Sequence, residues 1–78
     1  MENKIREIVG MVLELSADDT DALQEDTDLL ELGLDSMTCV EVVVNLEEEF
    51  GITVEEEDLL VENMATIRLL CDLVEKYQ

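Results

Sequence analysis

Apolar residues recur at helical spacing in three stretches of this chain of 78 residues. The i, i+3, i+4, i+7 pattern near the start predicts an amphipathic helix from about Asn3 to Leu15, in which Gly10 should cost about 1 kcal/mol relative to Ala. A run without Gly or Pro predicts a second helix from Ser36 to Phe50, which ends at Gly51. A last helix is expected from about Thr66 to Tyr77. Its apolar positions form two stripes: Ile67, Leu70, Cys71 and Val74, and then Leu69, Leu73 and Tyr77.

The segment between the first two helices, residues 16–35, is rich in carboxylates. A loop of this length needs anchors or a function, and its leucines can serve as anchors. We therefore expect an ordered loop with a short helical turn at about Asp28 to Leu32, which stops at Gly33. The expected anchors are Leu23, Leu29, Leu30, Leu32 and Leu34.

A short connector follows the second helix. Thr53 and Glu56 have capping-box spacing, which predicts a short third helix from about Glu55 to Val61. A break at residues 62–65 precedes the last helix, whose cap would be Thr66 or Asn63. Four helices without a strand-rich segment indicate an all-α fold, a small helical bundle in a single domain over residues 1–78.

The second helix has two apolar stripes on opposite sides. The inner stripe, at the spacing of a buried face, consists of Cys39, Val42, Val43, Leu46 and Phe50. The outer stripe, where a surface helix should be polar, consists of Met37, Val40 and Val44. Carboxylates border the outer stripe, which suggests a docking surface for a partner with an apolar groove and a basic rim. The alternative is that a neighbouring loop covers Val40 and Val44.

Ser36 lies at the start of this helix, and it is the candidate for a covalent attachment point. Either Asp35 or Ser36 could instead serve only as the helix N-cap, since both residue types are favoured there. A phosphodiester on Ser36 would lie at the positive end of the helix dipole, near unpaired backbone N–H groups.

The stretch Leu32-Gly33-Leu34-Asp35-Ser36-Met37 resembles the acyl carrier protein family, including its peptidyl and D-alanyl carrier relatives. The resemblance continues through Val40-Glu41 and through Leu46 to Ile52, and it covers nearly the whole chain. It implies that Ser36 is modified with 4′-phosphopantetheine by a phosphopantetheinyl transferase. It also implies the acyl-carrier four-helix bundle, with three longer helices and a short third one, and a pocket that could shelter an acyl chain.

Composition agrees with a carrier that works through other proteins. The chain has 22 acidic and 4 basic residues, a net charge of −18 and no histidine. Such a charge argues against nucleic acid or an anionic membrane as partner, and it favours a monomer that meets basic surfaces. Ser36 has no histidine to activate it, so we expect no catalytic activity and place the chemistry in partner enzymes.

The expected partner-binding residues lie on and just before the second helix. Carboxylates would pair with Lys and Arg of acyl- or aminoacyl-loading and processing enzymes, while the outer stripe would supply the apolar contact. The carboxylates are Asp35, Glu41, Glu47 and Glu48, and the apolar residues are Met37, Val40 and Val44. For each carboxylate, an ordinary solvated surface charge is the alternative.

No metal site is expected. The acidic loop does not meet the EF-hand requirement for Gly at the sixth position, whether the loop begins at Asp19 or at Asp26. Cys39 and Cys71 have no companion histidine and are interpreted as core thiols without a disulfide. No secretory signal or membrane-spanning run is apparent, and we expect a cytoplasmic location.

Departures from the family pattern bear on the pathway. Many fatty-acid carriers have an acidic residue where this chain has Thr38, and Val44 and Asn45 also differ from the usual residues. These differences favour a free-standing carrier in a dedicated polyketide, nonribosomal peptide or aminoacyl pathway. Housekeeping fatty acid synthesis is the alternative, and an unmodified acidic interaction domain is a further one.

Overall fold

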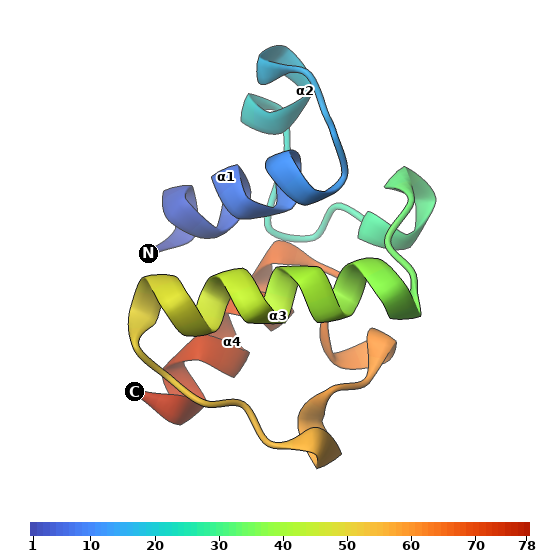
Figure 1. The fold of residues 1–78 in the computed structure, drawn as a ribbon. Helices are drawn as coiled ribbons and strands as arrows, with labels where there is room; N and C mark the ends of the chain where they lie inside the picture. Colours follow the sequence, from blue (N-terminus) through green and yellow to red (C-terminus); the bar gives the residue numbers. More distant parts are fainter.

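The computed structural model describes residues 1–78 and contains helices without strands (Figure 1). The α-helices are α1 (Glu2–Val12), α2 (Ala17–Asp21), α3 (Ser36–Phe50) and α4 (Ile67–Tyr77). Three single 3₁₀ turns are η1 (Leu29–Leu32), η2 (Glu56–Asp58) and η3 (Val61–Asn63). α3 crosses the molecule, and α1 packs against α2, α3 and α4. The all-α fold with three longer helices is confirmed.

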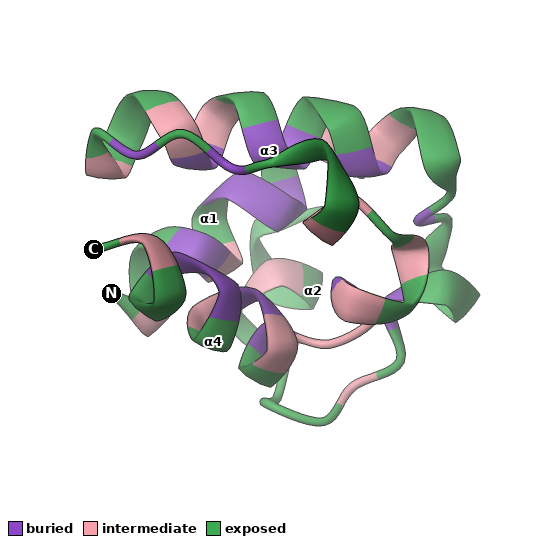
Figure 2. Cartoon of the chain, turned by 90° about the horizontal axis from the view of Figure 1, so that it is seen from below, coloured by how far each residue is buried: buried purple, intermediate pink, exposed green.

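The core is aliphatic, as the composition predicts. Its buried side chains form one cluster, and no polar or charged side chain is buried. Figure 2 shows the buried positions of α3 on the side that faces α1, with exposed positions on the opposite side. The buried members from the three long helices are Ile5, Ile8, Val9, Cys39, Val42, Val43, Leu46, Ile67, Leu70, Leu73 and Val74. The inner stripe is thereby confirmed, with Phe50 half-buried at its end.

α1 ends at Val12, three residues before the predicted Leu15. The chain leaves the helix through Glu14, whose φ of 57° lies in the left-handed region. The backbone N–H of Leu15 then donates to the carbonyl of Gly10 at 2.8 Å, as in a C-terminal capping turn that usually has glycine at the left-handed position. The apolar spacing continued past the point where the backbone turns away, so the predicted end was wrong.

α2 lies within residues 16–35, which were predicted to be a loop with one turn. It was not predicted because its sequence, Ala-Asp-Asp-Thr-Asp, has no apolar periodicity. Ser16 caps α2 by accepting a hydrogen bond from the N–H of Asp19 at 3.1 Å. The helix lies close to α1, and a Cβ atom at Gly10 would be 2.2 Å from Thr20 Oγ1. Gly10 therefore permits the close approach of these two helices.

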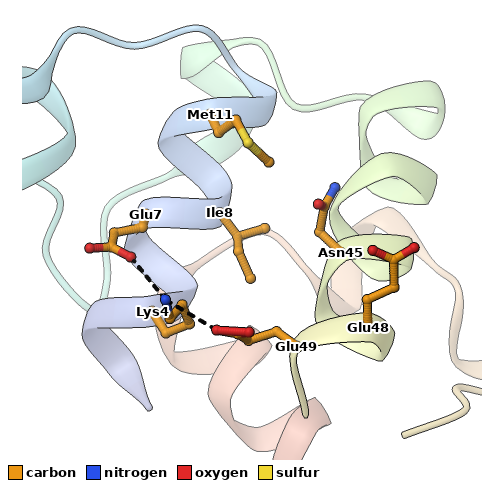
Figure 3. A pocket seen from close by; sticks show the side chains of 7 residues that line it. All are labelled: Lys4, Glu7, Ile8, Met11, Asn45, Glu48 and Glu49. Atoms are coloured by element: carbon orange, nitrogen blue, oxygen red, sulfur yellow. Dashed lines mark ion pairs between the residues drawn. The ribbon is translucent and has the colours of Figure 1, made fainter. Parts of the chain in front are cut away.

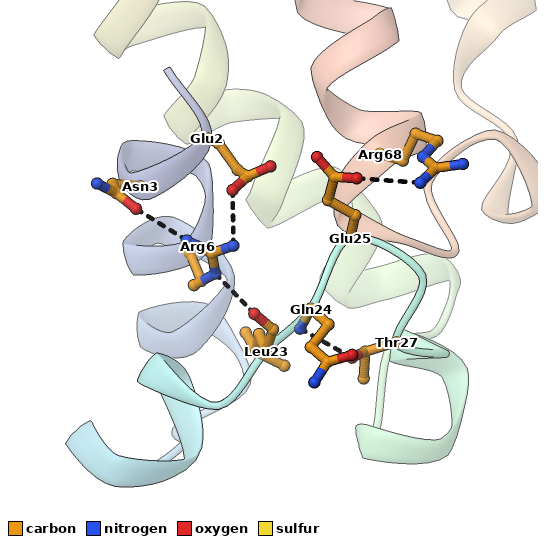
Figure 4. A network of polar contacts seen from close by, with 8 residues as sticks. All are labelled: Glu2, Asn3, Arg6, Leu23, Gln24, Glu25, Thr27 and Arg68. Carbon is orange, nitrogen blue, oxygen red and sulfur yellow. Dashed lines mark hydrogen bonds and ion pairs between the residues drawn. The ribbon is translucent and has the colours of Figure 1, made fainter.

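The rest of this loop is ordered by contacts with distant elements (Figure 4). Arg6 of α1 donates to the carbonyl of Leu23 at 2.8 Å, and Arg68 of α4 pairs with Glu25 at 3.0 Å. The N–H of Leu29 also donates to the carbonyl of Ala65 at 2.8 Å. These contacts tie residues 23–29 to both terminal helices.

Only some of the expected leucine anchors are buried. Leu23, Leu29 and Leu34 lie in the core, whereas Leu30 and Leu32 are exposed. The predicted turn at 28–32 is confirmed as η1, and Gly33 ends it with a φ of 110°. A single 3₁₀ turn cannot direct every leucine inward, so the assignment of Leu30 and Leu32 as anchors was wrong.

The short third helix predicted at Glu55–Val61 is instead the two 3₁₀ turns η2 and η3. The capping-box prediction was also wrong, because no side chain caps η2. Asp58 accepts hydrogen bonds from Lys76 and from the Tyr77 hydroxyl of α4. This segment is held by α4 and carries several adjacent carboxylates, which disfavour a continuous helix.

The cap of the last helix, α4, is one of the two residues predicted for it, Thr66 and Asn63. Thr66 is its cap and accepts from the N–H of Leu69 at 3.1 Å.

Cys39 is buried and Cys71 half-buried, and both are free thiols. No helix is both long and apolar enough to cross a membrane.

Candidate attachment site and docking face

The N-terminus of α3 is held by a capping box. Asp35 Oδ1 accepts from the backbone N–H groups of Met37 at 3.0 Å and Thr38 at 2.9 Å. The hydroxyl of Thr38 in turn accepts from the N–H of Asp35 at 2.7 Å. Asp35 is therefore the cap, and Ser36 is the first residue of the helix proper.

Ser36 is exposed and its hydroxyl has no hydrogen-bond partner in the protein. The backbone that presents it is nevertheless well held. Gly33 adopts the left-handed conformation that turns the chain, and the side chain of Leu34 is buried in the core. The hydroxyl thus projects into solvent from a fixed position, with room for a long substituent.

The electrostatics at this helix end differ in part from the expectation. Hydrogen bonds from Thr38, and then from Met37, lower the pKa of the Asp35 carboxyl below its usual value. Asp35 therefore occupies two of the free N–H groups and remains an anion. Of the first helix donors, the N–H of Ser36 itself is left without a protein partner.

A lowered pKa also makes Asp35 a weak proton acceptor. The chain has no histidine, so no side chain near Ser36 is suited to activate its hydroxyl.

The outer stripe of α3 is open to solvent. Met37 is 76% exposed, Val40 54% and Val44 46%. The alternative that a loop covers the two valines is therefore wrong. These residues form an apolar strip along the outward side of α3, which begins one residue after Ser36.

The predicted partner carboxylates fall into two groups. Glu41 and Glu48 are exposed and make no ion pair or side-chain hydrogen bond within the protein. Asp35 caps the helix, and Glu47 is half-buried and accepts from the N–H of Val54 at 2.9 Å. The charges freely available to a partner are therefore those of Glu41 and Glu48.

Further exposed apolar residues lie outside α3, and the sequence did not mark them as exposed. The exposed Leu30 and Leu32 belong to η1, which lies beside the N-terminal end of α3 in Figure 1. Leu60, between η2 and η3, is also exposed. Leu30 and Leu32 were interpreted as anchors because leucine is usually buried, and no periodic signal marked them as exceptions.

The structure contains no group of three His, Cys, Asp or Glu side chains placed to hold a metal ion. The five main surface hollows are each lined by at most two apolar residues. None of these hollows is therefore a ready-made pocket for an alkyl chain.

The chain is similar to known proteins over most of its length. Residues 3–74 match the family described as phosphopantetheine attachment site. The chain is 40% identical over 78 residues to acyl carrier protein 2, chloroplastic, of Spinacia oleracea, covering 100% of this chain and 57% of that protein. It is 43% identical over 63 residues to acyl carrier protein 1, chloroplastic, of Casuarina glauca, covering 81% of this chain and 45% of that protein. The chain spans about half the length of these curated relatives.

Proposed function

Because this chain belongs to the acyl carrier protein family, whose domain is the attachment site of phosphopantetheine, we propose that Ser36 carries a 4′-phosphopantetheine arm and that the domain holds acyl groups on it as thioesters. Members of this family are carriers and not enzymes. The observation that carries the proposal is the exposed, unpaired hydroxyl of Ser36 on a capped helix end, next to an exposed apolar strip.

The residues present fit this group. The Ser36 hydroxyl would attack the pyrophosphate of coenzyme A, so that one phosphodiester bond forms and 3′,5′-ADP leaves. The serine proton would go to a base of the phosphopantetheinyl transferase, because Asp35 is a poor acceptor. The arm would supply a thiol for thioester chemistry, and its flexible tether would raise the effective concentration of the acyl group at a docked enzyme.

The outer stripe and its free carboxylates support a docking role for α3. A partner with Lys or Arg beside a small apolar hollow would contact Glu41 and Glu48 while it covers Met37, Val40 and Val44. Such a partner would approach Ser36 directly, since the stripe begins one residue away. Asp35 and Glu47 would add to the negative potential at this face, while Asp35 caps α3 and Glu47 accepts the hydrogen bond from Val54.

The cargo of the arm and its pathway are proposed from the relatives and from Thr38. The relatives are named as acyl carrier proteins, which supports an acyl cargo. Thr38 supports a dedicated polyketide, nonribosomal peptide or aminoacyl pathway, because a capping hydroxyl stands where a basic partner could otherwise contact a charge. Housekeeping fatty acid synthesis is the second candidate. Loading assays with malonyl and fatty acyl donors, compared with aminoacyl adenylates, distinguish these candidates.

Two further proposals concern the setting of the domain. A net charge of −18 supports a monomer, which light scattering would test. We keep the cytoplasm as the proposed compartment, although the relatives are named chloroplastic. Localisation of a tagged full-length protein would decide between the two compartments.

The decisive experiment is intact mass spectrometry after incubation with coenzyme A, Mg²⁺ and a broad-specificity phosphopantetheinyl transferase. The chain offers a matched control, because its two serines, Ser16 and Ser36, both lie exposed at helix starts. We expect Ser16→Ala to gain one phosphopantetheinyl group, as the unchanged chain does, and Ser36→Ala to gain none.

The opposite result would favour an acidic interaction domain that is never modified. In that result the unchanged chain gains no mass with several transferases, although circular dichroism shows that it is folded. In that case Ser36→Ala should also be harmless in cells, and basic binding partners would become the object of the search.

A further inference from the structure

A second concave surface runs along the line where α1 meets α3. It lies beside the outer stripe, and Glu41 and Glu48 stand between the two surfaces. It consists of two adjoining hollows, each of about 450 Å³, which share Met11 and Asn45. Figure 3 shows the first hollow, with Met11 and Asn45 facing one another from the two helices. We call the two hollows together the α1–α3 groove.

The apolar part of the α1–α3 groove comes from α1. Ile8 is nearly buried and Val12 half-buried, whereas Met11 is 61% exposed. A methionine this exposed leaves a flexible apolar side chain available for contact with a partner. Neither the attachment chemistry at Ser36 nor the outer stripe uses these residues.

Carboxylates from both helices border the groove. The only cation is Lys4, which already pairs with Glu49 at 3.1 Å and with Glu7 at 3.5 Å. Both pairings raise the pKa of Lys4 and keep it charged, with Glu49 the larger cause. The excess of negative charge therefore remains, and the bordering carboxylates are Glu7, Glu14, Glu41, Glu48 and Glu49.

From the apolar Met11 between two acidic rims, we propose that the α1–α3 groove binds a basic amphipathic helix of a partner protein. The α3 side of the groove runs from Thr38 to Glu49, a length of about 16 Å or roughly three helical turns. A helix with apolar residues at i, i+3 and i+4 would cover Met11, while Lys or Arg on its flanks would face the carboxylates of both rims.

Charge complementarity excludes the other obvious occupant. A second copy of this chain carries the same charge of −18 and only four basic residues. All four make ion pairs with carboxylates of their own chain: Lys4, Arg6, Arg68 and Lys76. A second copy therefore has no free basic face to place in this groove.

The test uses the full chain and a synthetic helical peptide of about 18 residues, roughly five turns, with leucines on one face and lysines on the other. Nuclear magnetic resonance shifts are mapped, and affinity is measured by calorimetry at physiological ionic strength. We expect shifts at residues 7–14 and at the α1 side of α3. Met11→Lys should weaken binding about tenfold or more, because it places a cation among the lysines of the peptide.

Leu60→Lys is the matched control, since it makes the same charge change at an exposed apolar residue that lines neither hollow. It should leave the affinity for the peptide almost unchanged. Ser36→Ala should also bind normally, so that this proposal and the attachment proposal can fail separately.

Three results would each overturn the groove assignment. The first is an equal loss of affinity in the Met11 and Leu60 variants, or shifts centred on the outer stripe. The second is equal binding of a control peptide of the same charge with glutamine in place of leucine, which would show simple charge attraction. The third is no binding of the amphipathic peptide, or shifts with concentration in the absence of peptide, which would indicate self-association.

Discussion

Replacement of Gly10 by alanine tests the packing of α1 against α2. In an isolated helix this change would stabilise the structure by about 1 kcal/mol, because glycine has more conformational freedom to lose. In this protein the new Cβ would lie 2.2 Å from Thr20 Oγ1, 2.7 Å from its Cγ2 and 3.0 Å from its Cβ. Ordinary contacts need about 3.5 Å or more, so α2 would have to move by roughly 1 Å.

A threonine rotation cannot remove this clash. The Cβ of Thr20 carries two heavy groups, and two of its three substituent positions point at Gly10, so every rotamer leaves at least one heavy atom there. Overpacking of this kind costs about 1 to 3 kcal/mol. The cost should fall near the middle of this range, at about 2 kcal/mol, because three atoms of Thr20 are too close at once while α2 buries no residue and can partly shift.

We therefore expect Gly10→Ala to lower the free energy of unfolding by about 1 kcal/mol in spite of its better helix propensity. For a domain of this size the midpoint of thermal unfolding should fall by about 4–8 °C, as followed by circular dichroism. Urea titration gives the free energy itself.

The control is Thr20→Ser, which leaves one heavy group that can rotate away from Gly10. The double variant with Gly10→Ala should be more stable than the sum of the two single changes, by about 0.5 kcal/mol or more. A Gly10→Ala variant that is more stable than the unchanged chain, with no coupling to position 20, would refute the close approach of α1 and α2.

The remaining predictions concern the helix ends and the docking face. Glu14→Gly should stabilise the domain by about 1 kcal/mol, because the left-handed φ of 57° suits glycine. Urea unfolding should show a higher midpoint with an unchanged dependence of the free energy on urea concentration. Equal or lower stability would contradict backbone strain at Glu14. Asp35→Asn should lower stability at neutral pH, because the lowered pKa of Asp35 means that its charged form stabilises the fold above its ordinary pKa. The difference in stability between Asp35→Asn and the unchanged chain should disappear as the pH falls below about 4, through the folded pKa. A stability difference that does not depend on pH would contradict the role of the Asp35 charge. Glu41→Lys should slow modification or acyl transfer several-fold, most at low salt, without unfolding the domain. Asp21→Lys on α2 is the control and should leave these rates unchanged. Equal rates in the two variants would show that Glu41 is not part of the docking face.

Local signals in the sequence predicted much of this protein. The three long helices follow from apolar periodicity, and their caps at Asp35 and Thr66 involve hydrogen bonds to residues only two or three positions away. Gly51 adopts a left-handed conformation at the end of α3, as its residue type indicated. The exposure of the outer stripe also followed, because one helix cannot bury two opposite faces in a domain with a single core.

Tertiary structure decided the features that depend on residues far apart in the chain. The segment after α3 forms 3₁₀ turns against α4, where the hydroxyl of Tyr77 accepts from the N–H of Glu55, 22 residues away. Glu47 became a structural acceptor for Val54, and Gly10 became the contact point for α2. The α1–α3 groove exists only where two helices meet. Periodicity describes which face of one helix is apolar, whereas the position of a neighbouring helix depends on how all faces pack together.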